Sequence, residues 1–129
     1  MAKSLMDFVA QARDRVNHVA ADQVETLRAE RPDLLILDVR ESDEYAQGHI
    51  PGAHLVPRGL IEGAGDPTYK KRDEVLCAAH QRPIIVYCAS GGRSAMAADT
   101  LQQMGFEEVY NLAGGFDNWE AEDMPVDTD

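Results

Sequence analysis

Residues 83–97 have the sequence Pro83-Ile84-Ile85-Val86-Tyr87-Cys88-Ala89-Ser90-Gly91-Gly92-Arg93-Ser94-Ala95-Met96-Ala97, an apolar run followed by a glycine turn and a further segment. The apolar run is short and rich in β-branched residues, which is typical of a strand buried on both faces. The segment after the turn favours a helix. A strand, a tight turn and a helix in this order form the unit from which parallel α/β sheets are built.

Cys88 stands at the end of the predicted strand, directly before the turn. A glycine turn that leads into a helix directs successive backbone N–H groups and the helix dipole at one point, which favours an anion there. Arg93 falls in the first helical turn, where a cation is unfavourable for the helix dipole, so we expect it to serve the anion-binding loop. These surroundings favour the thiolate, and we interpret Cys88 as a nucleophile rather than a small buried core residue.

Four motifs, in order along the chain, resemble those of rhodanese-like sulfurtransferases. They are Leu37-Asp38-Val39-Arg40 with Glu44-Tyr45, Gly48-His49-Ile50-Pro51-Gly52-Ala53, Cys88-Ala89-Ser90-Gly91-Gly92-Arg93-Ser94, and Leu112-Ala113-Gly114-Gly115-Phe116 with Trp119 and Pro125. Together they extend from about Asp38 to Pro125. The resemblance implies a three-layer α/β fold, in which a five-stranded, mainly parallel sheet of order 1-5-4-2-3 carries helices on both faces.

The chain length fits one such domain over residues 1–129. We expect residues 1–16 to form an N-terminal helical extension, capped by Ser4, and the core to cover about 17–126. Strands and helices alternate, which predicts a parallel sheet with its ligand site at the carboxyl ends of the strands. Between the third and fourth strands we expect a loop over Leu60–Tyr69 and a helix over roughly Lys70–Ala79. Asp123 stands where relatives usually have a glycine closing the last helix, which predicts a strained turn.

The resemblance implies an enzyme of the rhodanese (thiosulfate sulfurtransferase) type that uses no metal and no dissociable cofactor. The Cys88 thiolate would attack the outer sulfur of a small anionic donor such as thiosulfate, and the resulting persulfide would pass its sulfur to cyanide or a thiol. The loop would stabilise the charge on sulfur, and Arg93 would orient the donor; its residues are Ala89, Ser90, Gly91, Gly92, Arg93 and Ser94. Supporting roles are expected for Asp38 and Arg40, as a charge pair at a strand end, and for Arg58, which could line the substrate entrance.

Two other functions are compatible with part of the sequence. No basic residue lies between Cys88 and Arg93, whereas relatives that use thiosulfate often have one there. The main alternative is therefore a persulfide carrier or interaction module that a sulfur-relay protein loads. Cysteine phosphatases and arsenate reductases place five residues between cysteine and arginine, in a cradle sized for a tetrahedral oxyanion. This chain has four residues there, which disfavours a hydrolase.

The composition restricts the classes of partner and location. A formal net charge of -11 argues against nucleic acid, because phosphate binding needs a basic face. No apolar run is long enough to cross a membrane, and the N-terminus lacks the pattern of a secretory signal. Two cysteines imply no disulfide framework, so we expect a cytoplasmic protein in which Cys77 belongs to the core. The four histidines show no metal-site spacing, and Lys70-Lys71-Arg72 is expected to be solvated, with the substrate entrance as its alternative.

Overall fold

The centre of the molecule is a five-stranded sheet, which a computed structural model of the chain describes together with the rest of residues 1–128. Its strands are β1 (Asn17–Val19), β2 (Leu35–Asp38), β3 (His54–Leu55), β4 (Pro83–Tyr87) and β5 (Glu108–Leu112). Their spatial order is β1-β5-β4-β2-β3, and every neighbouring pair runs parallel. The predicted strand order is therefore confirmed. Because all strands point the same way, their carboxyl ends meet at one edge of the sheet.

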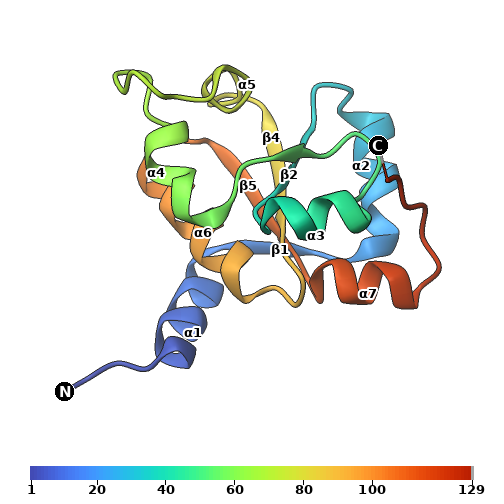
Figure 1. The fold of residues 1–129 in the computed structure, drawn as a ribbon, viewed down its shortest axis with the longest axis horizontal. Coiled ribbons are helices and arrows are strands. Elements are labelled where there is room, and N and C mark those ends of the chain that lie inside the picture. Colours follow the sequence, from blue (N-terminus) through green and yellow to red (C-terminus); the bar gives the residue numbers. More distant parts are fainter. Residues whose placement is uncertain (129) are drawn as a thin grey trace.

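Helices cover both faces of this sheet, as the sequence predicted (Figure 1). They are α1 (Leu5–Arg15), α2 (Val24–Glu30), α3 (Ser42–Gln47), α4 (Ile61–Ala64), α5 (Glu74–Cys77), α6 (Gly92–Gln103) and α7 (Gly115–Ala121), with 3-10 turns η1 (Ala21–Gln23) and η2 (Arg58–Leu60). One core cluster joins the sheet to α4, α5 and α6. The other joins it to α2 and α7, with α3 packed against its edge. The result is a three-layer α/β domain.

Strand β4 supplies both of these cores. Ile84 and Val86 lie in the cluster under α6, whereas Ile85 and Tyr87 lie in the cluster under α7. Successive side chains of a strand point to opposite faces, so a central strand covered by helices on both sides must be apolar throughout. All five residues of β4 are buried, which confirms the interpretation of the apolar run.

The N-terminal helix α1 is fixed to the domain through α6. Ser4 caps it, since the Ser4 hydroxyl accepts a hydrogen bond from the Asp7 backbone at 3.2 Å and the Asp7 carboxylate accepts one from the Ser4 backbone at 2.9 Å. Val9 and Ala12 are buried, and α1 packs against α6. The apolar side chains of α1 are only partly buried, however, because Leu5 is 65% exposed.

The prediction of a helix over roughly Lys70–Ala79 is wrong, because the structure has only the single helical turn α5 (Glu74–Cys77) there. Asp73 determines where this turn begins. Its backbone N–H donates to the carbonyl of Ala64 at 2.9 Å, and its side chain accepts the Leu76 N–H at 2.9 Å as an N-cap. An N-cap residue has non-helical backbone angles, so the preceding residues cannot continue the helix.

The loop expected over Leu60–Tyr69 is also corrected, because it contains the short helix α4. Ile61 and Ala64 of this helix are buried in the core cluster beneath α6. A single turn with two apolar residues is too short to show helical periodicity, so the glycines and Pro67 dominated the sequence pattern.

Asp123 closes α7 in a left-handed conformation, with a φ of 59°. Within residues 1–128 it is the one residue other than glycine that has a positive φ. The turn is closed by hydrogen bonds from the Asp123 N–H to the Glu120 carbonyl at 3.0 Å and from the Met124 N–H to the Trp119 carbonyl at 3.2 Å. This is the position where helices commonly place glycine, and the left-handed backbone is one that strains other residues.

Candidate active site

Cys88 follows β4 at the carboxyl edge of the sheet and is 1% exposed. The chain then turns through Gly91, whose φ of 106° lies in the left-handed region that favours glycine, and α6 begins at Gly92. The strand, turn and helix predicted from the sequence therefore form as expected. They wrap the loop around the side chain of Cys88.

Three hydrogen-bonding groups converge on the sulfur of Cys88. The backbone N–H of Gly91 donates to Sγ at 3.1 Å, and the backbone N–H of Ser94 does so at 3.4 Å. The Ser94 hydroxyl lies 3.3 Å from the same sulfur. N–H dipoles directed at one atom stabilise negative charge on it, so the loop favours a thiolate or a persulfide anion.

A chain of polar contacts, which runs from buried Ser94 and Asn111 to exposed His18, holds the Ser94 hydroxyl in place. Ser94 donates to the Asn111 side-chain oxygen at 2.5 Å, and the Asn111 amide nitrogen lies 3.3 Å from Nδ1 of His18. The other ring nitrogen of His18 lies 3.0 Å from the Arg13 carbonyl oxygen. Sequence analysis missed this connection, although Asn111 was visible as a polar residue in an otherwise apolar strand end. A buried polar side chain normally has a hydrogen-bond partner. The partner of Asn111 is the Ser94 hydroxyl, so Asn111 orients the hydroxyl that lies against the Cys88 sulfur.

The N-terminus of α7 holds the loop from the opposite side. The backbone N–H of Phe116 donates to the Cys88 carbonyl at 2.8 Å, and that of Asp117 donates to the Ala89 carbonyl at 2.9 Å. Gly115 makes this approach feasible: it has a φ of 59°, and a Cβ there would lie 2.6 Å from each carbonyl oxygen. These two hydrogen bonds fix the start of the loop against the N-terminus of α7. Gly114 and Gly115 belong to one of the four motifs, but the role of Gly115 depends on contacts with residues 88 and 89 that the sequence does not show.

Arg93 points its guanidinium at Glu44 of α3. Its two terminal nitrogens donate to the two carboxylate oxygens at 2.9 and 3.1 Å, a bidentate arrangement. The hydrogen bond from Arg93 is the main reason why the pKa of Glu44 is lowered to about 2. The guanidinium expected to orient the donor is therefore partly occupied by the Glu44 carboxylate. The role of Arg93 in donor binding stays a prediction.

Asp38 and Arg40 form the expected charge pair at the end of β2. The guanidinium of Arg40 donates to both Asp38 oxygens, and Tyr87 donates to the same carboxylate at 2.7 Å. Arg40 also donates to the Gly48 carbonyl at 2.7 Å, so the pair joins β2 to the turn after α3. Burial, followed by the negative charge of Asp38, raises the pKa of Tyr87, which keeps its phenol protonated as the donor. No described hydrogen bond connects the pair to Cys88, in keeping with a supporting role.

Arg58 and Cys77 lie apart from the loop contacts. Arg58 on η2 forms an ion pair with Glu62 at 3.2 Å and lies 3.4 Å from the Thr100 hydroxyl of α6. The thiol of Cys77 donates to the Ala64 carbonyl at 3.3 Å. Burial, followed by the charge of Glu74, raises the pKa of Cys77, which disfavours its thiolate.

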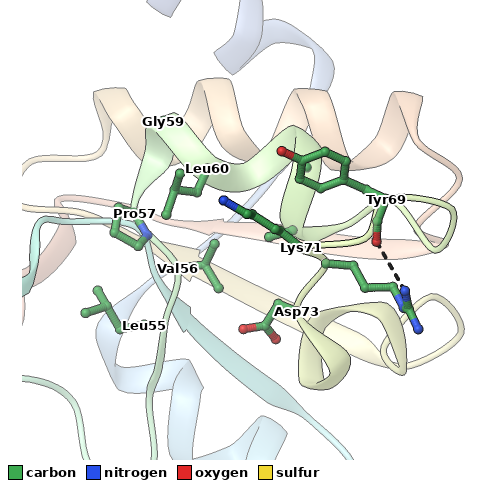
Figure 2. Close-up of a pocket in the computed structure, with 11 residues that line it drawn as sticks. Leu55, Val56, Pro57, Gly59, Leu60, Tyr69, Lys71 and Asp73 are labelled. Carbon is green, nitrogen blue, oxygen red and sulfur yellow. Dashed lines mark hydrogen bonds between the residues drawn. The ribbon is translucent and has the colours of Figure 1, made fainter.

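A cavity of about 580 Å³ lies along β3, between this strand and the segment that leads to α5 (Figure 2). It is lined by Leu55, Val56, Pro57, Gly59, Leu60, Gly63, Ala64, Tyr69, Lys71, Arg72 and Asp73. The structure thus places Lys71 and Arg72 at this cavity, and none of its lining residues belongs to the loop from Cys88 to Ser94. This cavity therefore lies apart from the hydrogen-bond donors that converge on Cys88.

Residues 1–128 contain neither a cluster of metal-ligating side chains nor a membrane-spanning helix. No group of three or more histidine, cysteine or acidic side chains is arranged there to hold a metal ion. None of the helices in that part of the chain has the length and apolar character needed to cross a membrane.

Several named proteins resemble the chain in sequence. A sulfurtransferase of Allochromatium vinosum is 33% identical over 111 residues, which cover 86% of this chain and 94% of that protein. The thiosulfate sulfurtransferase GlpE of Coxiella burnetii is 34% identical, with 83% and 87% covered. The putative sulfur carrier protein YrkF of Bacillus subtilis is 40% identical over 67% of this chain, but the match spans only 41% of that longer protein.

One solved structure and one family model each match most of the chain. A structure from Rhodopseudomonas palustris, described as a protein of unknown function and possible tyrosine phosphatase, has a TM-score of 0.90 and 27% identity, and the match covers 98% of this chain and 96% of that one. The sequence model of the rhodanese-like domain matches residues 20–122. With this match over most of its length and a cysteine loop at the carboxyl edge of a 1-5-4-2-3 sheet, the chain belongs to the rhodanese-like domain family.

Proposed function

We propose that this protein is a rhodanese-type sulfurtransferase in which Cys88 carries the transferred sulfur as a persulfide. The relatives named as sulfurtransferases support sulfur transfer as the general activity. One observation carries the assignment to Cys88: the N–H groups of Gly91 and Ser94 point at its sulfur. Donors fixed in this way stabilise charge on sulfur before and after transfer without reorganising.

The proposed reaction has two halves. The Cys88 thiolate attacks the outer sulfur of thiosulfate, a new S–S bond forms, and the old one breaks with its electron pair on the departing sulfite. Cyanide or a thiolate then attacks the outer sulfur of the persulfide, giving thiocyanate or a new persulfide and restoring the Cys88 thiolate. No electrons are gained or lost overall, so no cofactor is needed. A cytoplasmic location belongs to the same proposal, because free thiols persist in a reducing compartment.

Steady-state kinetics with thiosulfate and cyanide test this function. Double-reciprocal plots at several cyanide concentrations should be parallel, as expected for a ping-pong reaction. The Cys88→Ser variant should lose turnover while remaining folded by circular dichroism. An aryl phosphate serves as the control substrate: faster hydrolysis of the phosphate than sulfur transfer would replace the proposal with a phosphatase, whose larger cradle this loop does not match.

A persulfide carrier is the second candidate. Two observations favour it: Arg93 is engaged by Glu44, and one relative is a putative sulfur carrier. A carrier would accept sulfur from a protein persulfide faster than from thiosulfate. Loading rates from a cysteine desulfurase and from thiosulfate, measured side by side on the reduced protein, separate the two functions. Faster loading from thiosulfate together with multiple turnover supports the enzyme.

A further inference from the structure

Helix α1 lies beside the start of α6, outside the residues that match the family (Figure 1). Two polar contacts fix the end of α1 to α6: Arg15 pairs with Asp99 at 3.1 Å, and Gln102 donates to the Arg15 carbonyl at 3.0 Å. The buried Val9 of α1 reaches the loop itself, since its side chain lies 3.5 Å from where a Cβ on Gly92 would be. The helix therefore adds a wall next to the loop that holds Cys88.

A cavity of about 210 Å³ lies between this wall and the loop. Its lining residues are Leu5, Met6, Val9 and Arg13 from α1, and Ser90, Gly92, Arg93 and Met96 from the loop and α6. Three of these belong to the loop that surrounds Cys88. An engineered protein cavity of roughly 150 Å³ binds benzene, so there is room here for one aromatic ring.

Arg13 is the uncommitted cation of this cavity. Within residues 1–128 its side chain forms no hydrogen bond or ion pair, and its Nη2 lies 3.8 Å from where a Cβ on Gly91 would be. The guanidinium of Arg93, by contrast, is held by Glu44. In a chain of net charge -11, an anion that approaches the loop depends on such a local cation.

On the α1 side of the cavity, two apolar side chains are exposed to solvent. Leu5 and Met6 are 65% and 60% exposed, although they stand on a helix whose other apolar face is buried. Together with Val9 and Met96 they form a surface that covers an apolar group beside the cation. Exposed apolar side chains that gather at one cavity are typical of a ligand-binding groove, whereas singly scattered ones are not.

We propose that this cavity, the α1 subsite, binds sulfur donors that combine an anionic head with an apolar body, such as an organic thiosulfonate. Arg13 binds the anionic head, and Leu5 and Met6 contact the body. This deepens the proposed function and rests on it for the chemical step. The Cys88 thiolate attacks the outer sulfur of the thiosulfonate, an S–S bond forms, and the donor's S–S bond breaks with its electron pair on the sulfinate that leaves.

The first test is kinetic and uses thiosulfate and benzenethiosulfonate as paired donors with cyanide as acceptor. We expect Arg13→Gln to raise the KM of both donors about tenfold and to leave kcat unchanged, with Arg13→Lys recovering part of the loss. Met6→Ser should raise the KM of the aromatic donor about fivefold and leave that of thiosulfate unchanged. Arg82→Gln makes the same change in charge at the opposite end of β4 and should alter neither KM.

The second test does not depend on catalysis. Benzenesulfonate, which cannot transfer sulfur, is titrated into the Cys88→Ser protein while chemical shifts are followed by NMR. We expect shifts on α1 and in the loop, and weaker binding after Arg13→Gln or Met6→Ser but not after Arg82→Gln. Binding that these α1 variants do not weaken would overturn the subsite even if sulfur transfer is confirmed. If the α1 variants weaken binding as expected but the wild-type protein transfers no sulfur from any donor, the subsite is supported and the proposed function is refuted.

Discussion

Replacing Gly115 with alanine tests whether α7 positions the nucleophile. A Cβ at this residue would lie 2.6 Å from the carbonyl oxygens of both Cys88 and Ala89, which are backbone atoms that cannot rotate away. Moving them apart breaks the hydrogen bonds from Phe116 and Asp117, each worth about 1 kcal/mol. The left-handed backbone at φ 59° costs an alanine about 1–2 kcal/mol more. We therefore expect Gly115→Ala to lower the free energy of unfolding by about 3–4 kcal/mol.

Gly105→Ala is the matched control for this change. Gly105 also has a left-handed φ, of 92°, but nothing lies within 4 Å of where its Cβ would be. It should show only the backbone cost of about 1–2 kcal/mol. Urea unfolding measures both variants, and turnover is compared per folded molecule. Displacement of the loop should lower the turnover of Gly115→Ala about 10–100-fold, and Gly105→Ala should keep the wild-type value. Equal losses of stability, or full activity in Gly115→Ala, would refute the reasoning.

Three further variants probe other parts of the account. Asp123→Gly should raise the free energy of unfolding by about 0.5–1 kcal/mol, because glycine tolerates the φ of 59°; a loss of stability in urea unfolding would show that the Asp123 side chain compensates for the strain. The pKa of Glu44 is lowered from 4.5 to about 2, so the stability from its pair with Arg93 is complete above pH 4.5 and is lost as pH falls towards 2. Because both side chains are about one-third exposed, Glu44→Gln should cost only about 1 kcal/mol at pH 7, and this difference should shrink on acidification; a difference independent of pH would contradict it. Cys77→Ser should keep most of the turnover, since its thiol donates to Ala64 and not to the loop; loss equal to that of Cys88→Ser would require a two-cysteine mechanism.

The parts of the fold that local pattern determines could be predicted from the sequence. The apolar run of β4 and the glycine turn after Cys88 are short-range signals, and both form as expected. The segment between β3 and β4 could not be predicted, because Asp73, which caps its helix, is held in place by a contact with Ala64. Length and periodicity carry no information about such a contact.

In the candidate site, too, contiguous residues could be predicted and contacts between distant residues could not. Cys88 and its loop are contiguous in sequence, so the strand, turn and helix around them could be predicted. The partners that orient the loop are far away along the chain: Glu44 is 49 residues from Arg93, and Asn111 is 17 residues from Ser94. The position of Arg13 beside the loop could not be predicted, because α1 precedes the motifs of the family and only packing against α6 brings it there.

The central claim is that Cys88 holds the transferred sulfur, and intact mass spectrometry tests it most directly. The reduced protein is incubated with thiosulfate, desalted and weighed, beside Cys88→Ser and Cys77→Ser. We predict a gain of one sulfur atom in the wild type and in Cys77→Ser, removed by cyanide, and no gain in Cys88→Ser. No gain in the wild type while Cys88 can still be alkylated, or an equal gain in Cys88→Ser, would contradict the account.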